Sequence, residues 1–291
     1  MNGIINVYKP LGISSFDVVR QVRRLCKIKK VGHTGTLDPL AEGVLPICIG
    51  KATKLVDYIM SENKVYETAL MLGIVTETYD REGSIISETA VSSNTEEIKE
   101  AIYQFVGESY QLPPMYSAIK VNGKRLYELA RKGIEIGRDK RHIIIHNIDI
   151  TKIDLPIINF TVCCSKGTYI RSLCYDIGHS LGCGGTMWNL TRTSTGQFNK
   201  ENSVKLSELN EDNILDYLIP MDKVLEKYSK ITIEDKHMKL LLNGGPIKDE
   251  TIYNNNLSNE FELYRIYNEE GGFLGLGKFI DESLKMEKLL I

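Results

Sequence analysis

The sequence predicts an α+β protein with one large domain and a smaller C-terminal one, and three observations favour this class. Short β-type runs alternate with capped amphipathic helices up to a break at Pro220, Met221 and Asp222. A chain of 291 residues is long enough for one large core and a second, smaller unit. Residues 231–291 combine a short helix pattern, an NGGP turn and two strand patterns, as in a compact β-rich unit.

The first elements are a strand and a cationic helix. An apolar run at residues 3–8 predicts a strand, which ends at a Lys-Pro pair. Ser14 or Ser15 then caps a helix, with Asp17 in its first turn. The polar side and exit of this helix carry six cations and no acid: Arg20, Arg23, Arg24, Lys27, Lys29 and Lys30. Such a stripe is either a solvated face or a contact for a polyanion.

The later elements follow from periodicity and capping signals. Helices are expected at 95–105, after an Asn94 cap signal, and at 166–181, with Arg171 in its first turns. Strands are expected at 44–49, 65–74, 142–150 and 157–164, with a turn-and-strand segment at 191–198. In the C-terminal part we expect a helix at 234–242 and strands at 262–267 and 273–280.

The net charge of −2 conceals an asymmetry along the chain. Residues 1–200 contain 25 of the 36 Lys and Arg but 20 of the 38 Asp and Glu. Residues 201–291 contain the remaining 11 basic and 18 acidic residues. A basic large part followed by an acidic tail suggests a polyanionic ligand for the large part.

Several classes of protein are disfavoured. The six cysteines form no CxxC pair and no disulfide framework, and no signal peptide or membrane span is present, so we expect a reduced, cytoplasmic protein. Cys174, His179 and Cys183 match no structural-zinc spacing, and no metal is expected. The GKATK run at 50–54 lacks phosphate-loop spacing, and no dinucleotide fingerprint is present, so no cofactor is expected.

The segment 31–44, VGHTGTLDPLAEGV, is too rich in glycine, threonine and proline for the interior of a helix or strand. Asp38 directly precedes Pro39, and a residue before proline is pushed out of the helical region. Its carboxylate therefore projects from a turn or extended segment. Two interpretations stay open for this residue: a structural turn or cap, or a carboxylate presented for chemistry.

A second distinctive segment spans residues 111–141. It begins with a Pro-Pro break, turns at Asn122–Gly123 and continues into a helix that ends near Gly133. From Pro113 onward it contains eight Lys or Arg against three acids, interleaved with Tyr116 and Tyr127. Cations with aromatic side chains suit a nucleic-acid surface, although surface tyrosines are also common packing residues.

Six segments together resemble the TruB family of tRNA pseudouridine synthases, in the order and spacing of that family. They are NVYKPLGISS, GHTGTLDPLAEGVLPICIGKATK, KVYETALMLGIVTETYD, PPMYSAIKVNGKRLYELAR, CSKGTYIRSL and LTRTSTGQF. The resemblance covers residues 1 to about 222. The C-terminal part is similar to the PUA-type RNA-binding domain of the family, but it is short and has no strong motif.

The resemblance implies a fold and an activity. Residues 1–222 would form a mixed, mainly antiparallel pseudouridine-synthase sheet with flanking helices and an RNA-gripping insertion at about 111–141. Residues 228–291 would form a small PUA-like β-barrel domain. The implied reaction is the isomerisation of uridine to pseudouridine at position 55 in the T-loop of tRNA, by base flipping and without a cofactor. The implied partner is the tRNA T-arm, bound by a monomer.

The resemblance also assigns roles, residue by residue. It makes Asp38 the nucleophile, Tyr66 the ring that stacks under the target base, and Arg171 the ion-pair partner of Asp38. The further pocket and RNA-binding positions are His33, Tyr169, Asp80, Lys9, Lys120, Arg125 and Leu190.

Two other functions compete with this hypothesis. A non-catalytic tRNA-binding chaperone would have no use for a buried ionised aspartate beside Tyr66 and Arg171. A base-excising or glycosidase-type enzyme generally needs two carboxylates that flank the bond, and only Glu42 is near Asp38 in the sequence.

Overall fold

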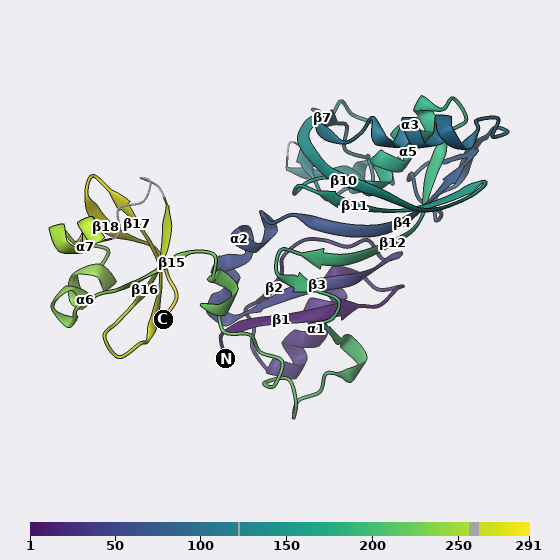
Figure 1. Ribbon diagram of the computed structural model, residues 1–291. Helices are drawn as coiled ribbons and strands as arrows, with labels where there is room; N and C mark the ends of the chain where they lie inside the picture. Colours follow the sequence, from purple (N-terminus) through teal and green to yellow (C-terminus); the bar gives the residue numbers. More distant parts are fainter. Residues whose placement is uncertain (122, 256–261) are drawn as a thin grey trace.

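The computed structural model describes residues 1–121, 123–255 and 262–291. Its main feature is a ten-stranded sheet in the order β14-β1-β3-β12-β4-β11-β10-β7, with β2 paired to β3 and β13 to β12 (Figure 1). The strands are β1 (Gly3–Lys9), β2 (Val31–His33), β3 (Ala41–Ile49), β4 (Lys64–Leu72), β7 (Gly107–Gln111), β10 (Arg141–Asp154), β11 (Ile157–Cys164), β12 (Gly185–Thr195), β13 (Phe198–Asn199) and β14 (Val204–Lys205). Only the β1–β14 and β3–β12 pairs are parallel. The mixed, mainly antiparallel sheet is therefore confirmed.

Strand β12 joins the two halves of this sheet. It runs parallel to β3 and antiparallel to β4, so that Leu190 is the register partner of both Ala41 and Thr68. In Figure 1, β1, β2, β3 and helix α1 (Ser15–Cys26) lie on one side of the β4–β12 pair. On the other side lie β7, β10, β11 and the helices α3 (Thr95–Tyr103) and α5 (Ile170–Ser180). Side chains from both halves form one hydrophobic core.

The helices begin where their caps dictate. Ser14 caps α1 in a reciprocal capping box with Asp17, and Asn94 caps α3 in the same way with Glu97. Helix α5 begins at Ile170, four residues later than predicted. The reason is Gly167, whose φ of +83° lies in the left-handed region and cannot belong to a helix. Residues 166–169 are consequently free to form a loop.

The segment between β7 and β10 contains a short hairpin and a short helix. Strands β8 (Lys120–Val121) and β9 (Lys124–Arg125) pair with each other, and α4 (Leu126–Ala130) follows directly. Of the predicted Asn122–Gly123 turn, Asn122 lies outside the described residues, whereas Gly123 has a φ of +80°. Another hairpin, β5 (Ile74–Thr76) with β6 (Ile85–Glu88), precedes α3.

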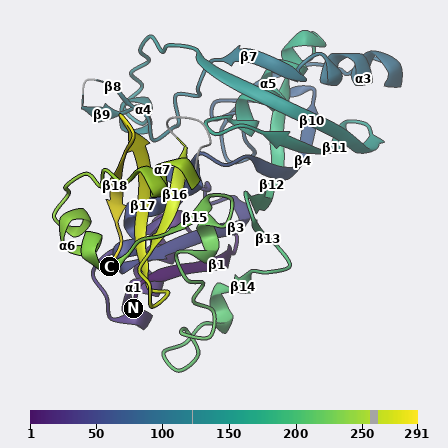
Figure 2. The same cartoon turned by 60° about the vertical axis from the view of Figure 1, so that its left-hand side comes forward.

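A second sheet occupies the C-terminal part (Figure 2). Strands β15 (Ser229–Thr232), β16 (Leu263–Tyr267), β17 (Phe273–Ile280) and β18 (Ser283–Leu289) pair in sequence order. Among the described residues β15 and β18 do not pair, so this sheet is open and not the predicted barrel. Four strands are too few to close around a core of side chains. Helices α6 (Asp235–Leu242) and α7 (Glu250–Asn255) contribute to its hydrophobic core instead.

The two sheets pack against each other through the short helices η1 (Gly50–Leu55) and α2 (Val56–Met60). Leu276 and Leu290 share a hydrophobic cluster with Leu55 and Ile59. The Lys54 ammonium also donates to the Leu289 carbonyl, at 2.7 Å. The remaining short helices of the described chain are η2 (Leu206–Glu208) and η3 (Lys223–Leu225). No helix in the described ranges is long and apolar enough to cross a membrane.

Gly43 marks the closest approach of β3 to β12. Its φ is +113°, and a Cβ at this position would lie 2.2 Å from the Arg192 carbonyl oxygen. The opposing atom is backbone and cannot rotate away. Only glycine therefore allows β12 to pair at this position of the sheet.

We expect Gly43→Ala to lower the free energy of unfolding by about 2–4 kcal/mol, because it combines a backbone clash with a disfavoured φ. The measurement is equilibrium urea denaturation. The matched control is Gly32→Ala on neighbouring β2, where an added Cβ meets nothing within 4 Å. Equal urea midpoints for the two variants would contradict the close approach.

Candidate functional site

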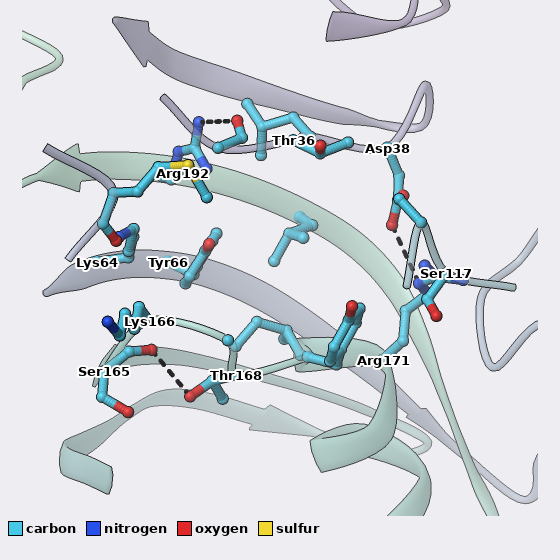
Figure 3. A pocket seen from close by; sticks show the side chains of 18 of the residues that line it. Thr36, Asp38, Lys64, Tyr66, Ser117, Ser165, Lys166, Thr168, Arg171 and Arg192 are labelled. Carbon is cyan, nitrogen blue, oxygen red and sulfur yellow. Dashed lines mark hydrogen bonds and ion pairs between the residues drawn. The ribbon is translucent and has the colours of Figure 1, made fainter. Parts of the chain in front are cut away.

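A cavity of about 500 Å³ lies beside the β4–β12 pair. Its walls come mainly from the loop 34–38 after β2, the start of β4, the loop 165–169 before α5, and β12 (Figure 3). Further lining residues lie at 117–118, at the start of β10 and in the first turn of α5. Of the residues with predicted roles, it brings together Asp38, Tyr66, Tyr169, Arg171 and Leu190. These residues are far apart in the sequence, and the sheet order places them at one site.

Asp38 lies at a tight turn, but its carboxylate takes no part in that turn. The Ala41 amide donates to the Asp38 main-chain carbonyl at 3.0 Å, which places Pro39 at the second position of the turn, where proline is favoured. The side chain instead forms an ion pair with Arg171, with Nε 3.0 Å from Oδ2. The turn is therefore formed by the backbone, and the carboxylate is left free to pair with Arg171 at the wall of the cavity.

The start of α1 holds this loop on both sides of Asp38. The buried Ser15 hydroxyl accepts from the Leu37 amide at 2.7 Å and donates to the Leu37 carbonyl at 3.0 Å. The Gly12 amide donates to the Pro39 carbonyl at 2.8 Å. Since Ser14 supplies the helix cap, Ser15 is free for this second task. The residues that flank Asp38 are therefore fixed independently of its own side chain.

Arg171 is the most connected side chain of the site. It lies in the first turn of α5 and is only 6% exposed, whereas the Asp38 side chain is 33% exposed. Its Nη2 donates to the Tyr116 carbonyl at 2.8 Å, and its Nη1 donates to the Thr78 carbonyl at 3.3 Å. Nη1 also lies 3.5 Å from Asp80 Oδ2. The guanidinium is thus directed at Asp38 by partners from two other segments, the turn at residues 78–80 and the segment that contains Tyr116.

Asp80 is placed behind Arg171 and does not line the cavity. Its other carboxylate oxygen accepts from the Thr78 hydroxyl at 2.6 Å and from the Glu82 amide at 3.1 Å. Tyr79, which lies between Thr78 and Asp80 in the sequence, has a strained φ of 61°. Its ring stacks on Tyr175 of α5, with ring centroids 4.1 Å apart. The carboxylate of Asp80 therefore anchors a cation and is not exposed to a ligand in the cavity.

Tyr66, Leu190 and Tyr169 surround the cavity with largely buried surfaces. Tyr66 is 9% exposed, and burial raises the pKa of its phenol, against the opposing effect of the Arg192 cation. Leu190 is buried on β12. The backbone of Tyr169, which precedes α5, pairs with both ends of the Gln111 side-chain amide at 2.8 and 3.0 Å. The Gln111 side chain thus supplies hydrogen-bond partners to the backbone at the N-terminus of α5, which has no side-chain cap.

Besides Asp80, four other predicted pocket or RNA-binding residues lie outside the cavity lining. His33 is on β2, and burial lowers the pKa of its imidazole. Lys120 and Arg125 are exposed partners on the β8–β9 hairpin. Lys9 is fully buried, and its ammonium donates to the Pro10 and Ile13 carbonyls, both at 2.8 Å. It therefore fixes the loop whose Gly12 holds Pro39.

Among the cavity residues that the sequence analysis did not single out are two buried cations. Arg192 on β12 is 1% exposed, and it donates to the Val44 carbonyl at 2.7 Å and to the Gly35 carbonyl at 3.2 Å. Lys64 at the start of β4 is 6% exposed, and it donates to the Glu62 carbonyl at 2.6 Å. The sequence signal that could have identified both residues is a cation within a strand whose other residues are predominantly apolar, as in a buried strand.

In the described chain, no group of three or more His, Cys, Asp or Glu side chains is arranged to hold a metal ion. The six cysteines are free thiols. Cys174 is fully buried in α5, and burial raises the pKa of its thiol to about 12, so it is a packing residue.

Comparisons with known proteins give one family. A model of the N-terminal domain of TruB family pseudouridylate synthases matches residues 23–170, and one of the tRNA pseudouridylate synthase B C-terminal domain matches residues 171–226. The chain is 56% identical over 291 residues to a Clostridium novyi protein and 55% identical over 290 residues to one from Clostridium acetobutylicum. Both are named tRNA pseudouridine synthase B, and both alignments span the whole of each chain.

The fold also matches solved structures. The archaeal box H/ACA sRNP Nop10-Cbf5 complex contains a chain that is 26% identical, with a TM-score of 0.71 over 99% of this chain and 86% of that chain. A chain of an H/ACA RNP bound to a substrate RNA containing 2′-deoxyuridine shares the fold at 24% identity and a TM-score of 0.71, over 99% of this chain and 85% of that chain.

The buried Lys9 ammonium predicts a pH dependence of stability. Burial outweighs the attraction of Asp38 and Glu42 and lowers the pKa of Lys9 from 10.5 to about 8. Between these values the unfolded chain retains a proton that the folded chain has released, so stability rises with pH in this window. We expect the unfolding free energy of the wild type, relative to Lys9→Met, to increase from about pH 8 to about pH 10.5.

The measurement is urea denaturation of both proteins across that range. Lys51→Met serves as the control, because the Lys51 side chain is exposed to solvent. If the difference in unfolding free energy between wild type and Lys9→Met stays constant with pH, the lowered pKa of Lys9 is refuted.

Proposed function

The chain belongs to the TruB family of pseudouridylate synthases, and on this premise we propose that it isomerises uridine to pseudouridine in tRNA, at position 55 of the T-loop. The observation that carries the proposal is the Asp38 carboxylate, held 3.0 Å from a buried arginine at the wall of a cavity that Tyr66 also lines. The catalytic unit is residues 1–222, and residues 228–291 form the tail unit.

The cavity suits one extruded nucleotide. A volume of about 500 Å³ lies in the range of small-molecule sites. A uridine inside a folded loop must leave its stack, which costs a few kcal/mol. Stacking on the Tyr66 ring offsets about 1–3 kcal/mol of this cost. Leu190 and Tyr169 provide the other apolar and aromatic surfaces around the base.

The chemistry needs one ionised nucleophile and no electron carrier. The bond between the ribose and the ring nitrogen breaks, the uracil turns, and a new bond forms through carbon 5. No atom and no electron is gained or lost. A carboxylate is a sufficient nucleophile for a covalent step. The Arg171 guanidinium forms an ion pair with the Asp38 carboxylate, and its fork geometry orients this carboxylate.

RNA binding is assigned to cationic surfaces outside the cavity. His33, Lys120 and Arg125 would contact the T-arm, together with the six cations on α1 and in the segment that follows it. Lys9 would act indirectly, because its buried ammonium fixes the loop whose Gly12 amide bonds the Pro39 carbonyl. The enzyme would act as a monomer in the cytoplasm.

The two competing functions fit the site less well. Asp38 is the only carboxylate among the residues that line the cavity, whereas a glycosidase-type mechanism generally needs two. A chaperone gains nothing from a carboxylate that is shielded on one side by a buried guanidinium. One assay separates all three functions: an unmodified tRNA transcript yields pseudouridine, free uracil or neither.

We expect Asp38→Asn to reduce pseudouridine formation by at least about 10³-fold, because the amide is not a nucleophile. Binding of the transcript should be largely retained. The matched control is Glu42→Gln, which neutralises a nearby carboxylate that does not line the cavity. More than trace activity in Asp38→Asn would refute the nucleophile assignment.

We expect Arg171→Lys to lose about 10²–10³-fold in single-turnover rate and much less in affinity, since lysine keeps the charge but loses the fork that contacts Asp38, Asp80 and two carbonyls. The rate is measured with enzyme in excess, and the affinity by filter binding. Equal losses in both would mean that Arg171 acts in binding and does not orient the nucleophile.

A further inference from the structure

The cations that line the cavity outnumber the acidic side chains that could neutralise them. Among the described residues, Asp38 is the only acid that lines the cavity, and Arg171 is already paired with this carboxylate. Four further cations line the cavity: Lys64, Arg141, Lys166 and Arg192. Within the part of the chain that the structure describes, none of these four forms a salt bridge.

Two of these cations are buried, which makes the imbalance costly. The hydrogen bonds of Lys64 and Arg192 go to main-chain carbonyls, which satisfy donors without neutralising charge. Glu62, the acid nearest to Lys64 in sequence, is paired with Lys227. Burial and the charges of Arg192 and Lys166 lower the pKa of Lys64 to about 8.

Three of the four cations, Lys64, Lys166 and Arg192, lie at one end of the cavity. Lys64 and Tyr66 are two apart on β4 and share a face of the strand, and Arg192 is the register partner of Tyr66 on β12. Figure 3 shows Lys64, Lys166 and Arg192 on one side of the Tyr66 ring, and Asp38 with Arg171 on the other. A group bound over Tyr66 would therefore face a carboxylate at one end and uncompensated cations at the other.

We propose that Lys64, Lys166 and Arg192 form an anion-binding subsite that takes a singly charged oxygen group of the RNA. This inference rests on the proposed function. The subsite lies within the cavity, at the opposite end from the Asp38–Arg171 pair, and Lys64 and Arg192 are held in place by the carbonyls that they contact.

Two parts of the substrate carry this chemistry. The first is a backbone phosphodiester next to the extruded uridine, which is charged throughout. The second is the uracil itself: when the C1′–N1 bond breaks heterolytically, the electron pair stays on the base and is shared with its ring oxygens, until a new bond from carbon 5 consumes it. The subsite would stabilise a phosphodiester already in the bound complex, and so increase affinity. It would stabilise a base anion only during the reaction, and so increase the rate.

The test compares three variants of the full chain on an unmodified tRNA transcript. Lys64→Met removes a buried cation of the subsite. Lys166→Met removes an exposed one that has no described side-chain contact, so its effect does not act through folding. Lys51→Met is the matched control, an exposed lysine outside the cavity. Affinity is measured over a range of salt, and the single-turnover rate at saturating enzyme.

A bound phosphodiester predicts that both subsite variants weaken affinity by about tenfold, and that the log–log salt slope falls by about 0.7–0.9, with the saturated rate unchanged. A base anion predicts the reverse: a rate at least about tenfold lower, with affinity and salt slope unchanged. Either pattern supports the subsite.

Subsite variants that match Lys51→Met in both affinity and rate would overturn the subsite while leaving the proposed function intact. If the wild type forms no pseudouridine from the transcript, the proposed function fails instead. The two failures are therefore distinguishable within one set of measurements.

Discussion

The buried guanidinium of Arg171 is the constraint on which the rest of the site depends. A cation taken out of water must be surrounded by acceptors, or it destabilises the fold. Its acceptors come from the Asp38 loop, the turn at Asp80 and the insertion at Tyr116, while α5 carries the arginine itself. One charged group thus fixes four segments relative to each other, and the position of the Asp38 carboxylate follows from that.

Much of the fold was predictable, because its signals are local. The Asn94 cap, the Ser14–Asp17 capping box and the apolar periodicity of α1 and α3 are written within a few residues of each other. The Asp-Pro pair likewise indicated a turn at Asp38. The resemblance to the family then implied a mixed, mainly antiparallel sheet, which no local pattern contains, whereas the order of its strands was not predicted.

The remaining features depend on tertiary contacts. Nothing near Lys9 in the sequence indicates that its ammonium is buried, because the carbonyls that hold it become acceptors only in the folded loop. Asp80 was expected to contact the substrate, and only the fold places Arg171 between it and the cavity. The cations Lys64 and Arg192 lie within strand patterns, where their burial results from pairing with distant strands. The open C-terminal sheet depends on which edges pair, and periodicity does not determine that.

The position of β12 between β3 and β4 has a consequence for biosynthesis. The two strands that it joins precede it by more than a hundred residues, so this part of the sheet cannot close until most of the chain has left the ribosome. Until then β3 and β4 each present an unpaired edge, which is a target for misassociation. Asp38 and Tyr66 are translated early, yet the cavity that they line is completed only by β12, one of the last strands of the ten-stranded sheet.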